Sequence, residues 1–145
     1  MVNMESVFIA QKPDVIWEFL EDVRNDVVWR QGITKAEWTS KPPYGAGSTG
    51  EHTHKQVGRL KWVITQYEPG NSFEFKHIEG ALAGSTAFFR VQPENGGSRV
   101  DFQATFTGPL KFRFMLIFMG GMMRKSMKTD LQTLKNHLEK ESHHE

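Results

Sequence analysis

The fold is decided by residues 110–140, which read LKFRFMLIFMGGMMRKSMKTDLQTLKNHLEK. Apolar residues recur there three or four positions apart, so they line one stripe of an α-helix. The stripe consists of Leu116, Met119, Met123, Met127, Leu131, Leu134 and Leu138. The opposite, wet face carries Lys125, Lys128, Asp130, Lys135, Glu139 and Lys140. A helix of about 28 residues reaches roughly 42 Å, and its single apolar stripe predicts that it covers a sheet.

The apolar stripe changes character along this helix. Its C-terminal half is leucine at regular spacing, which is typical of a fixed core. Its N-terminal half, residues 114–123, is apolar nearly all round and rich in methionine, a flexible side chain that suits variable surfaces. Gly120 and Gly121 weaken or bend the helix by about 1 kcal/mol per glycine relative to alanine. Two interpretations stay open, a bent core helix and a mobile wall over a ligand cavity.

The composition excludes several classes of protein. We expect one domain, residues 1–145, because this length suits a single core. The chain has 18 basic and 17 acidic residues, and the resulting net charge of +1 does not indicate a nucleic-acid partner. The absence of cysteine excludes disulfides, thiol nucleophiles and cysteine-based zinc sites.

No targeting or membrane-spanning segment is predicted. The first residues, MVNMESVFIAQ, lack a basic region followed by an apolar one. The longest apolar run, residues 114–123, has ten residues, about half of what a membrane-spanning helix needs. We therefore expect a soluble cytoplasmic protein with no stable membrane insertion.

The rest of the chain predicts two short helices and seven strands. A first strand over residues 6–11 ends before Pro13, which suits the start of a helix over residues 14–20. A second short helix or turn covers residues 24–30. Six alternating segments follow, over residues 34–40, 50–56, 60–67, 72–78, 85–92 and 99–107. Short turns join them, so consecutive strands are expected to be antiparallel neighbours.

Alternation within the strands indicates which face of the sheet is dry. In the strand over residues 72–78, Phe73, Phe75 and His77 point one way, and the charged residues between them point the other way. Only one face is apolar, and such a face must be covered by another element. One sheet with one dry face and one long striped helix predict an α+β fold in which the sheet grips the helix.

The order of several short motifs resembles the polyketide cyclase/dehydrase family. These motifs are PDVIWEFLED at 13–22, Trp29, YGAG at 44–47, YEPG at 67–70 and GGSRVDF at 96–102. Their shared order covers about residues 5–140. The family belongs to the START-like superfamily, also called SRPBCC or helix-grip, together with lipid-transfer domains and the birch-pollen allergen.

The resemblance implies a specific architecture. It implies a seven-stranded antiparallel sheet wrapped round the C-terminal helix, with two short helices between the first and second strands that close one end. It also implies a cavity between the sheet and that helix. Function does not follow from the fold, since such folds host carriers, cyclases and hydrolases alike.

The dry face supplies the side chains that could line such a cavity. They are Trp38, Trp62, Phe73, Phe75, Phe89, Phe102, Phe106, Phe118, Met119, Met122 and Met123. Aromatic side chains also fill cores, so about half of this set is expected simply to pack together. A ligand site requires that sheet curvature leave a gap of about 300–1,000 Å³ that these side chains do not close.

Three histidines are candidates for polar groups at the cavity. His77 is in register with Phe73 and Phe75, so it is expected to face inward, where histidine suits proton transfer near neutral pH. His52 and His54 share a face of their strand, and we expect it to be the inner one. The opposite choice would bury polar neighbours that are cheaper to leave in water, namely Glu51, Thr53 and Lys55. No carboxylate or fourth histidine has convincing ligand spacing with the three, so neither a metal nor a cofactor is predicted.

Two classes of function stay open, and a third is weaker. The wall is rich in Phe, Trp and Met and poor in paired acids and bases, which favours binding or transport of a small hydrophobic molecule. The alternative is a cyclase or dehydratase-like enzyme in which His77 and His54 assist proton transfer on a polyketide-like or aromatic substrate. A partner-binding or membrane-surface role would use a basic rim. That rim consists of Lys111, Arg113, Arg124 and Lys125.

Overall fold

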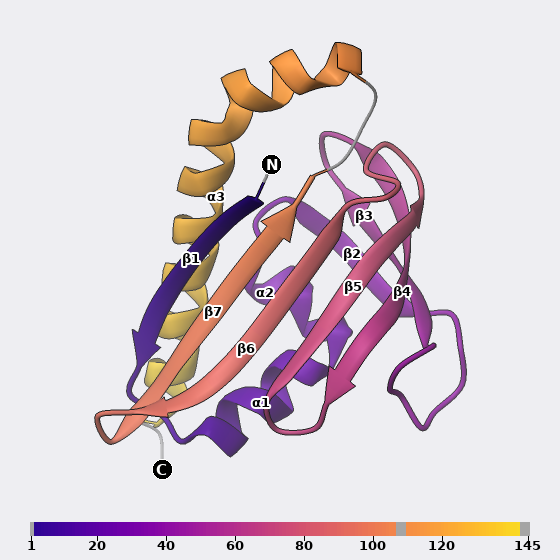
Figure 1. Cartoon of the computed structure of the whole chain (residues 1–145). Helices are drawn as coiled ribbons and strands as arrows, with labels where there is room; N and C mark the ends of the chain where they lie inside the picture. The colour runs from indigo at the N-terminus through magenta and orange to yellow at the C-terminus, as the bar shows by residue number, and fades with distance from the viewer. Residues whose placement is uncertain (1, 107–109, 143–145) are drawn as a thin grey trace.

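The structure, a computed structural model, is a curved sheet gripping a long helix (Figure 1). It describes residues 2–106 and 110–142, and within the long helix it describes the side chains of residues 121–140. The elements in chain order are β1 (Val2–Ile9), α1 (Pro13–Glu21), the 3-10 helix η1 (Val23–Asn25), α2 (Asp26–Trp29), β2 (Ile33–Trp38), β3 (Thr49–His54), β4 (Gly58–Glu68), β5 (Ser72–Glu79), β6 (Thr86–Glu94), β7 (Gly97–Thr105) and α3 (Leu110–Ser142).

The seven strands form one antiparallel sheet in the order β1-β7-β6-β5-β4-β3-β2. Strands β2 to β7 are a meander, and β1 joins its far end beside β7. Figure 1 shows α3 running beside β1 and bending in its first half, with α1 and α2 against the same sheet. This arrangement confirms the predicted α+β helix-grip fold, including the two short helices between the first and second strands.

A tight turn sets the register between strands β6 and β7. Between β6 and β7, Asn95 and Gly96 both adopt left-handed backbone, with φ of 47° and 80°. Asparagine and glycine tolerate this conformation, and the resulting two-residue turn matches the twist of a hairpin. The register that follows places Phe89 directly opposite Phe102. The two rings therefore face the core as a cross-strand pair.

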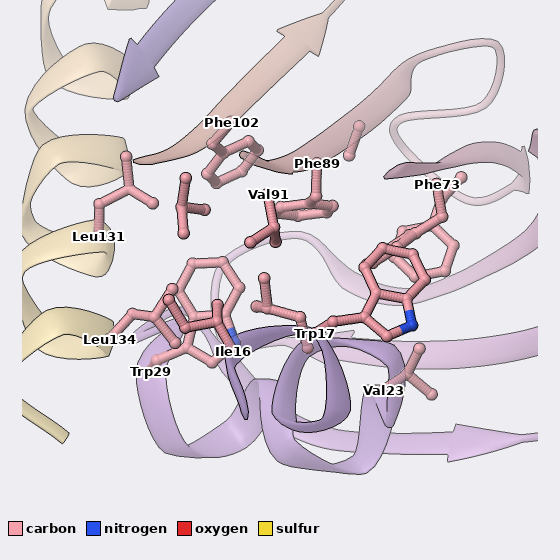
Figure 2. Packing of buried hydrophobic residues seen from close by; sticks show 14 of the residues in the cluster. Ile16, Trp17, Val23, Trp29, Phe73, Phe89, Val91, Phe102, Leu131 and Leu134 are labelled. Carbon is pink, nitrogen blue, oxygen red and sulfur yellow. The ribbon is translucent and has the colours of Figure 1, made fainter. Parts of the chain in front are cut away.

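The core lies between the inner face of the sheet, the short helices and the C-terminal half of α3 (Figure 2). Trp29 from α2 packs edge-on against Phe89 and Phe102, with ring centroids 5.7 and 6.1 Å apart. Trp17 from α1 packs edge-on against Phe73 at 5.5 Å. Such aromatic pairs add about 0.5–1.5 kcal/mol each beyond burial, so they fix the short helices against the sheet.

The C-terminal half of α3 buries the predicted stripe. The buried side chains are Met127, Leu131, Leu134 and Leu138. They belong to the main core cluster, together with residues of the sheet and of α1. The stripe is thereby confirmed over this half of the helix. No helix among the described residues is long and apolar enough to cross a membrane.

The prediction that Asp130 lies on the wet face of α3 is wrong. Its side chain is buried, and its carboxylate accepts a hydrogen bond of 3.1 Å from the backbone N–H of Gln31. The connection between α2 and β2 passes over this side of the helix, so α3 is covered on more than its apolar stripe. Burial raises the pKa of Asp130, and the hydrogen bond from Gln31 opposes that rise.

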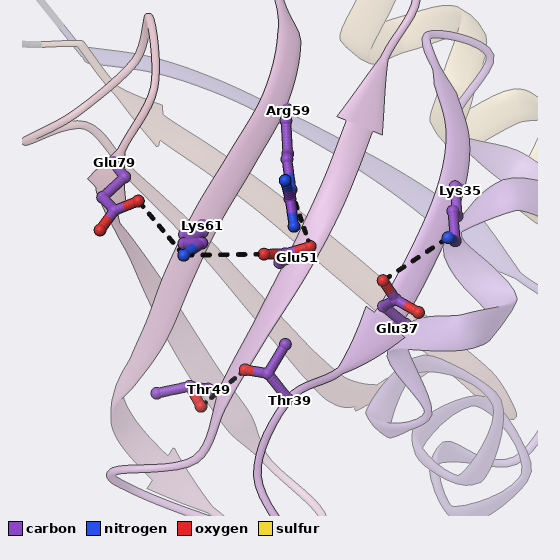
Figure 3. Close-up of polar contacts among 8 residues, drawn as sticks. All are labelled: Lys35, Glu37, Thr39, Thr49, Glu51, Arg59, Lys61 and Glu79. Atoms are coloured by element: carbon purple, nitrogen blue, oxygen red, sulfur yellow. Dashed lines mark hydrogen bonds and ion pairs between the residues drawn. The ribbon is translucent and has the colours of Figure 1, made fainter.

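The prediction that Glu51 lies in water is also wrong. Glu51 is only 8% exposed although it projects from the outer face of β3. Arg59 Nε lies 3.0 Å from one of its carboxylate oxygens and Lys61 Nζ lies 3.9 Å from the other (Figure 3). Long basic side chains from β4 thus cover the carboxylate, which strand alternation alone does not predict.

Candidate functional site: an aromatic pocket beside the first helix

A pocket of about 360 Å³ lies between the α1–η1 corner and strands β2, β4 and β5. Its lining residues are Glu21, Asp22, Val23, Arg24, Trp38, Tyr44, Ile64, Tyr67, Phe73 and Phe75. Half of them are aromatic, and the volume is within the range of small-molecule sites. None of the lining residues among the described side chains belongs to α3, and the described lining places the pocket beside α1.

The aromatic wall of the pocket is formed by side chains of β5, of the end of β2 and of the loop that follows β2. Phe73 and Phe75 alternate on the inner face of β5, with ring centroids 5.2 Å apart. Trp38 ends β2 and stacks on Tyr44 from the following loop, with centroids 3.7 Å apart and planes 7° from parallel. Trp38 also meets Trp62 edge-on at 5.5 Å. The outer wall of the pocket is therefore a stacked ring pair that rests on the core.

A carboxylate at the end of α1 is fixed beside this wall. Glu21 Oε2 accepts a hydrogen bond of 2.9 Å from the indole N–H of Trp17 and one of 3.1 Å from the hydroxyl of Tyr67. Burial raises the pKa of Tyr67, and the nearby Glu21 carboxylate raises it further. Tyr67 therefore stays a hydrogen-bond donor at neutral pH, and Glu21 is held in one orientation.

A second carboxylate, Asp22, is already paired at the rim. Its side chain caps η1 by accepting from the Arg24 backbone N–H at 3.1 Å. The guanidinium of Arg24 adds two hydrogen bonds to the same carboxylate, of 2.9 and 2.7 Å. These bonds from Arg24 lower the pKa of Asp22, with a smaller contribution from the indole of Trp38.

His77 faces inward as predicted, but it does not line this pocket. Its Nδ1 lies 3.2 Å from the backbone carbonyl oxygen of Ser85, and because a carbonyl only accepts, Nδ1 carries the proton. Burial lowers the pKa of His77 to about 4, and nearby Arg30 lowers it as well. The imidazole is therefore neutral at pH 7.

His52 faces inward too and joins β3 to α2. Its Nε2–H donates to Asp26 at 2.8 Å, and both side chains are buried. Arg30 Nη1 lies 3.8 Å from the same oxygen of Asp26, and its guanidinium lies over the ring of Phe102 at 5.6 Å. This group could not be predicted from the sequence, because Asp26 lies in the four-residue helix α2 and Arg30 directly follows it, and so short a helix shows no period.

His54 is half-buried at the end of β3, where its ring packs closely against the backbone of Gly32. Its Nδ1 accepts a hydrogen bond of 3.1 Å from the Gln56 backbone N–H. Burial lowers the pKa of His54, and Arg30 adds to that effect. No group of three or more histidine, aspartate or glutamate side chains in the described part of the chain could hold a metal ion.

The residues that the sequence predicts to bind ligand thus divide into several groups. The pocket brings together Trp38, Phe73 and Phe75. Trp62, Phe89 and Phe102 lie in the buried core, and His54 and His77 lie elsewhere on the sheet. Met122 is 70% exposed, Met123 is half-buried, and the side chains of Phe118 and Met119 lie outside the described residues.

Several lining residues were not predicted from the sequence. They are Glu21, Asp22, Arg24, Tyr44 and Tyr67. Four of these five lie within the short motifs PDVIWEFLED, YGAG and YEPG, at residues 13–22, 44–47 and 67–70. The motifs were therefore the available signal, but helix ends and loops have no periodicity that shows where a side chain points.

Comparison with solved structures supports the same fold. The protein Ara h 8.0201 superposes with a TM-score of 0.69 at 12% identity, covering 95% of this chain and 97% of that one. A protein of Thermus thermophilus, TTHA0849, gives a TM-score of 0.76 at 15% identity, covering 95% and 97%. Likeness at such low identity shows the fold alone, and that fold is the START-like helix-grip class.

The family is shown by the sequence itself. Residues 3–139 match the model of the family described as polyketide cyclase/dehydrase and lipid transport. The chain belongs to this family. An uncharacterized protein of Mycobacterium tuberculosis H37Rv is 33% identical over 100 residues, which are 66% of this chain and 59% of that relative. The match thus spans less than two thirds of the relative's length.

Proposed function

We propose that this chain binds and carries a small hydrophobic molecule, and that the aromatic pocket beside α1 is its site. The observation that carries the proposal is the pocket of about 360 Å³ walled by five aromatic rings, two of which, Phe73 and Phe75, also belong to the buried core cluster. Apolar and aromatic walls with a few fixed polar groups are typical of small-molecule sites. The family description, which includes lipid transport, is consistent with a carrier.

The alternative function, a cyclase or dehydratase-like enzyme, has less support. None of the histidines that the structure describes lines the pocket. His77 has its Nδ1 proton engaged by Ser85, and its pKa of about 4 makes it a weak base and leaves it unprotonated at pH 7. General acid–base catalysis works best when the pKa is near the working pH, so binding without chemistry is the function that the geometry favours.

A titration with 1-naphthalenemethanol, a neutral two-ring alcohol, tests the proposal. Binding is followed by calorimetry in the wild type, in Trp38→Ala and in a control, Phe88→Ala. Phe88 is an aromatic side chain next to inward-facing Phe89 on β6, and its ring lies against Arg90 rather than in the pocket. We expect Trp38→Ala to weaken binding by about tenfold or more, the loss typical of a buried aromatic anchor, and Phe88→Ala to leave it unchanged.

The opposite pattern would contradict the assignment. If Met123→Ala on α3 weakens binding while Trp38→Ala does not, the ligand lies against the C-terminal helix instead. If no probe binds and native mass spectrometry of protein from its own host shows no retained small molecule, the carrier function itself is wrong.

A further inference from the structure

We infer that the aromatic pocket selects hydrophobic molecules that carry a positively charged amine over neutral or anionic molecules of the same shape. The inference rests on the proposed function, because it names the chemistry of the ligand for that same pocket. The observation behind it is a carboxylate, set among aromatic rings, of which only one oxygen accepts hydrogen bonds from the described residues. The feature concerned is Glu21 with the rings of Tyr67, Trp38 and Phe73.

Glu21 has acceptor capacity left for a ligand. Both of its hydrogen bonds, from Trp17 and from Tyr67, go to Oε2. Oε1 receives no hydrogen bond from the residues that the structure describes. A carboxylate can accept about four hydrogen bonds, so the second oxygen is free to accept from an ammonium group in the pocket.

The other charges at the pocket do not cancel this one. The lining residues include two carboxylates and one guanidinium, Glu21, Asp22 and Arg24. Arg24 is bound bidentately to Asp22, at 2.9 and 2.7 Å, so these two neutralise each other. Glu21 has no basic partner among the described residues, so the pocket has a net negative charge. An anionic ligand would be repelled by Glu21, and a neutral one would lack the charge attraction that an ammonium group has to this carboxylate.

The aromatic rings favour the same ligand. A cation near the face of a tryptophan, tyrosine or phenylalanine ring is attracted by the negative charge density of that face. Trp38, Tyr44, Tyr67, Phe73 and Phe75 supply five rings around one pocket. A flat apolar body can pack against these rings while its amine reaches Glu21. The pocket thus combines the two features that bind organic cations, aromatic faces and one fixed carboxylate.

Three probes of matched shape test this inference. They are 1-naphthylmethylamine, 1-naphthalenemethanol and 1-naphthoic acid, which at pH 7 are cationic, neutral and anionic. Each is titrated by calorimetry at low ionic strength, where charge effects are least screened. We expect the amine to bind about tenfold more tightly than the alcohol, and the acid to bind least.

Two variants change the charge of the pocket in opposite directions. Glu21→Gln keeps an oxygen acceptor for Trp17 and Tyr67 but removes the charge, so the preference for the amine should fall to about parity. Arg24→Gln releases Asp22 from its partner, so the preference should rise severalfold. Glu18→Gln is the matched control, because Glu18 is exposed on α1 and lies outside the pocket. It should leave the preference unchanged.

The possible outcomes distinguish a failure of the charge selectivity from a failure of the proposed function. Failure of all three probes to bind would overturn the charge selectivity, and if native mass spectrometry also shows no retained small molecule, it would overturn the proposed function as well. Equal binding of amine and alcohol in the wild type, or a preference unmoved by Glu21→Gln and Arg24→Gln, would overturn the charge selectivity and leave the hydrophobic site standing. Near-ultraviolet circular dichroism shows whether Glu21→Gln is folded, and if it is not, the Arg24→Gln arm decides alone.

Discussion

Single buried groups set how this protein responds to pH. His77 is buried and neutral, with its pKa lowered from an ordinary value of 6.5 to about 4. Between these two pH values the unfolded chain binds a proton that the folded chain does not bind. The free energy of unfolding therefore falls as the pH drops from about 6.5 to about 4.

Replacing His77 should remove this part of the pH dependence. The shift corresponds to about 2–3 kcal/mol lost between pH 7 and pH 4.5. In His77→Gln the loss over the same interval should be smaller by that amount, because glutamine does not titrate. Urea unfolding of both proteins at the two pH values measures the difference. An identical loss in the wild type and the variant would show that His77 is protonated in the folded state or does not titrate as described.

At the level of single residues, the sequence predicted which face of a strand a side chain projects from. It did not predict which distant residues that side chain contacts. Alternation placed His77 on the inner face correctly, because a strand has a strict period of two. The inner face was expected for His52 because that choice left its polar neighbours in water, and His52 is buried although its neighbour Glu51 is buried too. Alternation did not predict that His52 would bond to Asp26, or that Glu51 would be covered by two basic side chains. Those contacts depend on residues distant in the sequence, and a local period does not contain them.

The described side chains in the two halves of α3 differ in burial and therefore in how much they contribute to the stability of the fold. Leu131 and Leu134 are buried in the core, whereas Met122, more than two helical turns toward the N-terminus, is 70% exposed. Deleting a buried leucine side chain removes its transfer free energy and leaves a cavity. An exposed methionine has neither contribution to lose.

Alanine substitutions along α3 should therefore separate into two classes. Leu131→Ala and Leu134→Ala are each expected to lower the free energy of unfolding by about 2–5 kcal/mol. Met122→Ala should change it by less than about 0.5 kcal/mol. Urea unfolding followed by far-ultraviolet circular dichroism measures all three. A loss for Met122→Ala equal to that of the leucines would mean that the methionine packs into the core in solution.

Helices and strands were predictable because the spacing of their apolar residues is regular and repeats along the element. The helix over residues 110–140 and six of the seven strands were predicted within about two residues of their observed bounds, whereas β1 begins at Val2, four residues before the predicted start at residue 6. The error at Asp130 has a specific physical cause. Helical periodicity assumes that only the apolar stripe is covered, but the connection that contains Gln31 also lies on α3 and buries a polar position.

At the scale of the whole molecule, the fold forms the pocket by bringing together elements that are distant in the sequence. Glu21 comes from the end of α1, Tyr44 from the loop between β2 and β3, and Phe75 from the middle of β5. The strand residues could be predicted to face inward. The helix end and the loop could not, because no period fixes their side chains. The resemblance to the family implies a cavity between the sheet and the C-terminal helix, and the described residues that line the pocket beside α1 come from the α1–η1 corner, the strands and the loop after β2.

Amide chemical-shift mapping tests most directly whether a small hydrophobic molecule binds beside α1. The ¹⁵N-labelled protein is titrated with 1-naphthalenemethanol, and the shift of every assigned amide is followed. We predict the largest changes at residues 21–24 and around Trp38, Tyr44, Tyr67 and Phe75, with small changes at residues 127–138 of α3. Changes concentrated along α3 with none at the α1–η1 corner, or no saturable change at all, would contradict the proposed site.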